Sequence, residues 1–264
     1  MELNAGSATI DMSPLSISLV VLACVFGGAL LGMLVSPMLL VHHQSSESKD
    51  IVRLGMGLVA TTVAVVLGLL ISSSKSFYDT QSNEVIQLAA NAVMLDRVLA
   101  HYGPETTEAR AALRAVLDNL LVSTESSERS NKVYGQIRSG TRLGEGVIDK
   151  IQGLSPKDDN QRSLKVQAFG LAFQIGQTRW LMFEQNTVPV PTLLLSMLIL
   201  WLIVLFLSFA IFAPRNLIVI AGLFLAAVAV CGAILLILEM YHPLSGLIRV
   251  SDAPLRAALA QLSQ

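Results

Sequence analysis

The residues best placed to do chemistry lie in one uncharged stretch, Leu54–Ser74, and in the lysine that follows it. At 100° per residue, a set of small or hydroxyl-bearing side chains falls within one sector of a helix, with Ala60 beside it. This small-residue stripe consists of Gly57, Thr61, Ala64, Gly68, Ser72 and Lys75. Along a water-filled pore, its hydroxyls would replace part of an ion's hydration, and Lys75 would give one mouth a positive potential. Against another helix, the same small residues would allow close packing, and both interpretations stay open.

The elements that must position this stripe are four long stretches without a charged residue. A helix needs about 20 apolar residues to cross a hydrocarbon core about 30 Å thick. Each stretch reaches that length: Pro14–Val41, Leu54–Ser74, Gln185–Pro214 and Asn216–Leu238. We therefore predict an all-α membrane protein, with four transmembrane helices and a helical extramembrane domain inserted between spans two and three.

The segment between spans two and three is expected to be helical because its apolar residues recur at helical spacing and do not alternate. The turns at Tyr102-Gly103-Pro104 and at Ser155–Asn160 divide it. The predicted organisation has an N-terminal tail at 1–13, spans at 14–41 and 54–74, the helical domain at 75–184, spans at 188–213 and 216–240, and a C-terminal tail with a short amphipathic helix at 241–264.

Composition argues against several classes of protein. Charged residues make up only 14% of the chain and the net charge is −1, so nothing suggests nucleic-acid binding. Cys24 and Cys231 both fall inside predicted spans, so the extramembrane segments have no thiol for a disulfide or a zinc site. No nucleotide-binding or hydrolase motif is present, and we expect neither an enzyme nor a cofactor. We expect no metal either, because the spacing of one polar cluster matches no known ligand set: His42, His43, Glu47 and Asp50.

Charged groups close to the span ends are further candidates. Glu239 ends span four, and Arg179 and Trp180 precede span three. A carboxylate at that depth usually faces protein or a watery cavity. Glu239 is therefore either an ion-pair partner of Arg179 or Lys75, or part of a proton or ion site.

Gly28 and Gly32 form a GxxxG pair in the first span. Glycines at this spacing let the backbones of two membrane helices approach closely. We expect these two residues to serve helix packing.

The side of the membrane on which the helical domain lies can be predicted from basic residues near the span ends. With four spans, the termini and the helical domain share one side. That side carries Lys75, Arg179, Arg249 and Arg256, and the other side carries Lys49, Arg53 and Arg215. The excess is small, and the positive-inside rule then favours a cytoplasmic helical domain.

Several local sequences resemble the bestrophin-like family of bacterial membrane proteins, and together they cover nearly the whole chain. They are residues 53–62, 66–71 with 75–81, 95–97 with 101–105, 177–181, 212–216 and 246–251. Remote kinship to bestrophins, which are pentameric chloride channels, implies that the second span lines a pore and that the helical domain lies in the cytosol. The chain departs from bestrophins because it has no acidic cluster like their calcium clasp and no aromatic-rich neck on span two.

The leading hypothesis is a homo-oligomeric, anion-permeable ion channel in a bacterial inner membrane, pentameric by the resemblance, with lipid and inorganic anions as partners. A non-conducting membrane scaffold or sensor, whose helical domain binds a partner, is the alternative. A proton-coupled transporter that uses Glu239 is a third possibility.

Overall fold

The structure is a computed structural model that describes residues 13–39, 46–125, 144–186, 192–241, 243 and 247–262. Every regular element in these described ranges is helical. The chain divides into two compact units. The membrane unit comprises Met1–Lys75 and Val190–Tyr241, and the helical unit comprises Ser76–Pro189 and His242–Gln264.

The membrane unit contains the first part of α2 and three further helices. All four helices are long and apolar enough to cross a bilayer. They are α1 (Pro14–Leu39), α2 (Ser46–Tyr102), α6 (Thr192–Phe212) and α7 (Leu217–Met240). The predicted fold class, an all-α membrane protein with four transmembrane helices, is thus confirmed.

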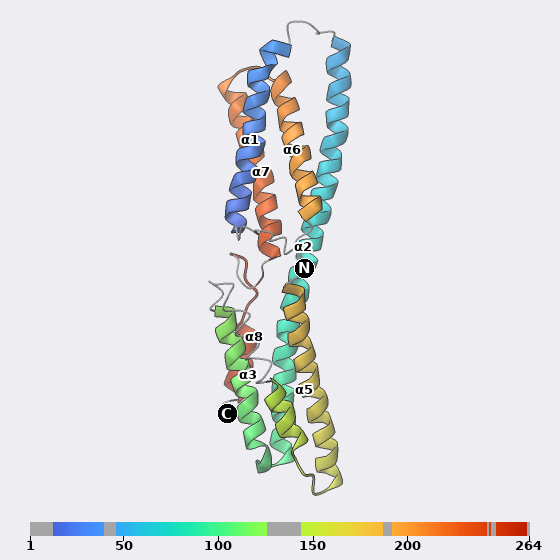
Figure 1. Ribbon diagram of the computed structural model, residues 1–264, viewed down its shortest axis with the longest axis vertical. Coiled ribbons are helices and arrows are strands. Elements are labelled where there is room, and N and C mark those ends of the chain that lie inside the picture. Colours follow the sequence, from blue (N-terminus) through green and yellow to red (C-terminus); the bar gives the residue numbers. More distant parts are fainter. Residues whose placement is uncertain are drawn as a thin grey trace, which may run out of the picture. The chain divides into compact units, whose positions relative to one another are not determined.

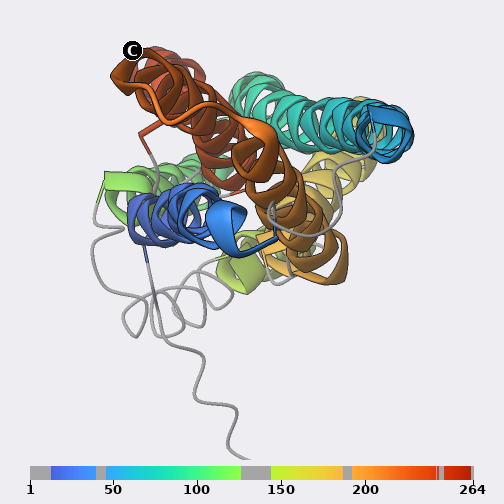
Figure 2. The same cartoon turned by 90° about the horizontal axis from the view of Figure 1, so that it is seen from above.

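Helix α1 packs against α6 and α7, as Figure 1 shows from the side and Figure 2 from above. The fully buried side chains of this packing include Val25, Leu198 and Ile234. Two polar contacts join α1 to the α6–α7 hairpin. The Ser36 hydroxyl donates to the Ile211 carbonyl at 2.8 Å, and the Arg215 guanidinium donates to a carbonyl of α1.

Helix α2 is a single helix of 57 residues, so span two and the following segment form one continuous element. Between residue 69 and Tyr102 the chain has neither glycine nor proline to interrupt it. The helix ends at Tyr102. The next residue, Gly103, has a φ of 134°, a conformation that favours glycine, and Pro104 follows. The predicted break at Tyr102-Gly103-Pro104 is confirmed.

Among the residues that the structure describes, the helical unit contains the end of α2 and four other helical elements of more than one turn. These are α3 (Thr107–Glu125), a helix at 144–152, α5 (Asp159–Asn186) and α8 (Ala253–Leu262), with the short 3-10 helix η1 (Pro104–Thr106) before α3. Their apolar faces meet in one core, in which Leu88, Leu95, Leu99, Leu113, Leu117, Ile151 and Leu262 are fully buried. The polar stretch at 126–143 lies outside the described residues.

The ion pair between Asp96 and Arg110 is partly buried in the helical unit. The Arg110 Nε–H donates to Asp96 Oδ1 at 2.6 Å, and a terminal N–H of the same guanidinium donates to Asp96 Oδ2 at 2.7 Å. Asp96 is only 7% exposed, and its hydrogen bonds raise the pKa of Arg110. The fork-like geometry binds α3 to α2. In the sequence, Asp96 is followed directly by Arg97, but the arginine that pairs with it comes from the next helix.

Candidate functional site

The small-residue stripe of α2 is exposed along its whole length in the single chain. Each of its six residues, from Gly57 to Lys75, is exposed to solvent. A Cβ atom added at Gly57 or at Gly68 would meet no other heavy atom within 4 Å. At these two glycines, therefore, the missing side chain does not make room for another described helix of the same chain.

A different face of α2 packs within the chain itself. Met56, Val63 and Leu70 are 9%, 6% and 4% exposed, and Ser74 is fully buried. On a helical wheel this face is centred about 130° from the small-residue stripe. The stripe of α2 therefore points away from the chain's own core.

A third face of α2 is apolar and also exposed. Leu54, Leu58, Val65 and Leu69 are 76%, 71%, 63% and 65% exposed. Large apolar side chains at such exposure need lipid or another protein chain around them. The small-residue stripe lies between this apolar face and the packed face.

The two hydroxyls of the stripe differ in their hydrogen bonds. The Thr61 hydroxyl donates to the carbonyl of Leu58, one turn earlier, at 2.8 Å. Ser72 has no hydrogen-bond partner among the residues that the structure describes. The Ser72 hydroxyl can therefore donate a hydrogen bond to an anion, whereas the Thr61 hydroxyl in this rotamer offers an ion only its oxygen lone pairs.

The end of α7 meets α2 close to the lysine end of the stripe. The Ser73 hydroxyl lies 3.3 Å from the Tyr241 hydroxyl, and the Ser74 hydroxyl lies 3.6 Å from the sulfur of Met240. Glu239, the residue before Met240, is only 4% exposed. The structure thus brings Glu239 into the buried part of the membrane unit.

Arg179 belongs to the helical unit, on α5. It is partly buried, and burial lowers its pKa because the guanidinium loses water. One of its terminal nitrogens lies 3.0 Å from where a Cβ on Gly144 would stand. Because Arg179 and Glu239 belong to different units, their pairing remains a prediction.

Gly28 and Gly32 lie where α1 approaches α6. A Cβ on Gly28 would come within 3.2 Å of Ile203, and one on Gly32 would come within 2.5 Å of the Leu207 carbonyl oxygen. Only glycine fits at Gly32 without moving the α6 backbone. By contrast, a Cβ on Gly27 would meet nothing within 4 Å.

No group of three or more potential metal ligands occurs among the described residues. Two members of the polar cluster considered in the sequence, His42 and His43, lie outside the described residues. Asp50 is exposed and lies 3.8 Å from Arg53.

Comparison with solved structures indicates the fold to which these elements belong. The chain is similar to crystal structures of a bacterial bestrophin homologue from Klebsiella pneumoniae. One variant of that protein matches with a TM-score of 0.66 and 14% identity, over 94% of this chain and 98% of the other. A second variant matches with a TM-score of 0.63 and 17% identity, over 95% and 97% of the two chains.

Sequence comparison extends the likeness from fold to family. A search of curated protein sequences found no match. The family model of the bestrophin-like domain, however, matches residues 23–255, which include all four spans apart from the start of α1, most of the helical unit and the start of α8. The chain is an integral membrane protein that belongs to the bestrophin-like family.

Proposed function

We propose that the protein is a homo-oligomeric ion channel whose pore is lined by the small-residue stripe of α2. The observation that carries the proposal is the direction of this stripe. It is exposed, it points away from the chain's own core, and a Cβ added at either of its two glycines would meet nothing within 4 Å. Small residues would allow a second copy to pack closely, or would leave room for water along an axis shared by several copies. Against lipid they would have no such effect.

The apolar face next to the stripe supports an oligomer. Its exposed leucines can be covered by a neighbouring subunit while the stripe turns toward the axis. From the kinship to bestrophins we expect a pentamer. The mass of the detergent-solubilised protein, measured by light scattering, should equal five chains of 28.3 kDa after correction for detergent.

We propose that the permeant ions are inorganic anions. The Ser72 hydroxyl can donate a hydrogen bond, and Lys75 lies one turn beyond it with a positive charge. Donors and positive charge favour an anion over a cation at this end of the pore. The charge acts within about a Debye length, about 10 Å at 0.1 M salt, so the preference should weaken as ionic strength rises.

Chloride efflux from liposomes that contain the purified protein tests the pore. Gly68→Trp would put an indole into a narrow pathway, and we expect efflux to fall at least about tenfold. Gly222→Trp on α7 is the matched control, because Gly222 is also an exposed helical glycine with nothing within 4 Å. This control should conduct like the wild type.

Other results would contradict the proposal. Absence of efflux from liposomes that hold folded wild-type oligomers would favour the scaffold or sensor hypothesis. Equal losses in the two tryptophan variants would mean that the stripe has no special part in conduction. Flux that requires a pH gradient and disappears in Glu239→Gln would favour the proton-coupled transporter.

We further propose that the protein resides in a bacterial inner membrane with the helical unit in the cytoplasm. Ser155 is exposed in the turn before α5 and can carry a reporter thiol. In a background without Cys24 and Cys231, Ser155→Cys should react with an impermeant maleimide only after spheroplasts are permeabilised. Labelling of intact spheroplasts would show that the helical unit lies on the opposite side of the membrane.

A further inference from the structure

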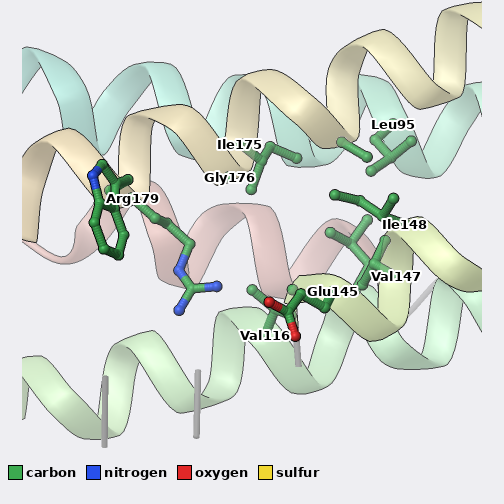
Figure 3. A pocket seen from close by; sticks show the side chains of 12 residues that line it. Leu95, Val116, Glu145, Val147, Ile148, Ile175, Gly176 and Arg179 are labelled. Carbon is green, nitrogen blue, oxygen red and sulfur yellow. The ribbon is translucent and has the colours of Figure 1, made fainter. Parts of the chain in front are cut away.

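The helical unit contains a pocket of about 150 Å³ between four of its helices. Figure 3 shows Leu95 of α2, Val116 of α3, Val147 and Ile148 of helix 144–152, and Ile175 of α5 around it. Most of its lining is aliphatic, and all of it comes from one compact unit. An apolar cavity of about this volume is large enough to hold a six-carbon ring.

One side of the pocket carries a positive charge. The Arg179 side chain leaves α5 and extends along the pocket toward helix 144–152, as Figure 3 shows. Its terminal nitrogen lies close to Gly144, where the absence of a Cβ gives the guanidinium room. A guanidinium at the edge of an aliphatic cavity can bind a planar carboxylate by two parallel hydrogen bonds.

We propose that this pocket binds a small carboxylate with a compact apolar body, such as an aromatic or branched aliphatic acid. The apolar body lies among Leu95, Ile148 and Ile175, and the carboxylate meets Arg179. A mostly apolar pocket with a small number of polar groups that point into it is typical of small-molecule sites.

The negative charge of Glu145 would repel an anionic ligand in the pocket. Its carboxylate faces the same side of the pocket as Arg179 (Figure 3). Glu145 is exposed, so water and salt screen its charge, whereas the partly buried Arg179 is screened less. We expect Glu145→Gln to strengthen binding of a carboxylate, by about twofold to threefold.

The pocket carries its own reporter, because Trp180 lines it. The chain has two tryptophans, so Trp201→Phe leaves Trp180 as the sole source of indole emission. The full-length protein with this change would be titrated with benzoate and with benzyl alcohol, its neutral analogue, at constant ionic strength. We expect saturable changes in emission with both probes, and tighter binding of benzoate.

Two variants separate the charge from the cavity. Arg179→Gln should weaken benzoate binding by about tenfold to a hundredfold and leave benzyl alcohol within about twofold, because the neutral probe makes no ionic hydrogen bond to the guanidinium. Gly176 also lines the pocket, and a Cβ there meets nothing within 4 Å, so Gly176→Leu should fill the cavity and abolish binding of both probes. Gly170→Leu on the same helix, at a glycine that is equally open but outside the pocket, should bind like the parent.

The proposal is wrong if benzoate gives no saturable change, or if Gly176→Leu and Gly170→Leu bind it equally well. It is also wrong if Arg179→Gln weakens both probes alike, since the site would then not recognise a carboxylate. Should Arg179→Gln fail to fold, Arg179→Lys keeps the charge but not the fork and should weaken benzoate selectively. Because the readout is fluorescence, these results do not depend on whether the protein conducts ions.

Discussion

At the scale of residues, the small-residue stripe is not chemically uniform. The Thr61 hydroxyl donates its hydrogen bond to the Leu58 carbonyl, so toward an ion it offers oxygen lone pairs, which suit a cation. The Ser72 hydroxyl is available to donate a hydrogen bond to an anion, and Lys75 adds a positive charge one turn further on. The preference for anions is therefore expected to arise at the Ser72–Lys75 end of α2.

Lys75→Glu should shift selectivity toward cations, because it replaces the only charge on the stripe by its opposite. In bilayer recordings under a tenfold KCl gradient, we expect the reversal potential to move by tens of millivolts toward the potassium potential. The limit for a monovalent ion is about 59 mV per tenfold gradient.

Lys75→Arg is the matched control, since it keeps the charge and should keep the reversal potential. The shift should shrink at high salt, where the charge is screened. Identical reversal potentials for Lys75→Glu and wild type at low salt would show that Lys75 does not determine the ion selectivity.

At the scale of elements, the contact between α1 and α6 depends on one glycine. The backbones approach so closely at Gly32 that a Cβ would stand 2.5 Å from the Leu207 carbonyl oxygen. Gly28, one turn earlier, is tight as well, but its nearest neighbour is a side-chain methyl of Ile203 that can move. The two members of the GxxxG pair should therefore respond differently to substitution.

Gly32→Leu should destabilise the membrane unit by at least about 1–3 kcal/mol, because it overpacks the α1–α6 contact. A lower melting temperature of the detergent-solubilised protein would show this effect. Gly27→Leu in the same helix should melt close to the wild type, since its Cβ meets nothing within 4 Å. If both variants melted at the same temperature, the close approach of the helices at Gly32 would not contribute to the stability of the membrane unit.

The connections of the helical unit predict a dependence on pH. Hydrogen bonds from Lys157 and Lys150 lower the pKa values of Glu105 and Glu108 below their usual 4.5. The Lys157–Glu105 pair ties η1 to the turn before α5, and the Lys150–Glu108 pair ties α3 to helix 144–152. A carboxylate whose folded-state pKa is lowered stabilises the fold above its unfolded-state pKa, and loses this effect as pH falls through the folded-state pKa.

We therefore expect the double variant Glu105→Gln and Glu108→Gln to lose less thermal stability than the wild type when the pH falls from 6 to 3.5. The difference should be small, because exposed ion pairs contribute little. Other carboxylates titrate in both proteins and cancel in the comparison. Parallel pH profiles of melting temperature would contradict this role of the two pairs.

At the scale of the whole molecule, uncharged runs of about 20 residues were sufficient to predict the four spans, because lipid leaves few alternatives to a helix. The break at Gly103 was also predictable, since glycine followed by proline ends a helix. The continuity of α2 was not evident, because the polar segment after Ser74 looks like a boundary although nothing in it interrupts a helix.

The site was less predictable than the fold. Helical spacing groups the residues of one helix, so it identified the small-residue stripe and the Gly28–Gly32 pair. It carries no information about partners from distant helices. The Asp96–Arg110 pair and the pocket beside Arg179 both depend on α3 or helix 144–152 meeting α2 and α5 in space. The direction of the stripe likewise became visible only when the packed face of α2 was known.

The central claim is that the small-residue stripe, and no other face of α2, lines an aqueous path. Single cysteines placed along α2 in a background without Cys24 and Cys231 test this most directly, with chloride flux recorded before and after a charged, water-soluble methanethiosulfonate. We predict that the reagent changes flux at Thr61→Cys, Ala64→Cys, Gly68→Cys and Ser72→Cys, and leaves it unchanged at Leu58→Cys, Val65→Cys and Leu69→Cys. Modification that follows the leucine face, or that is equal on both faces, would contradict the account.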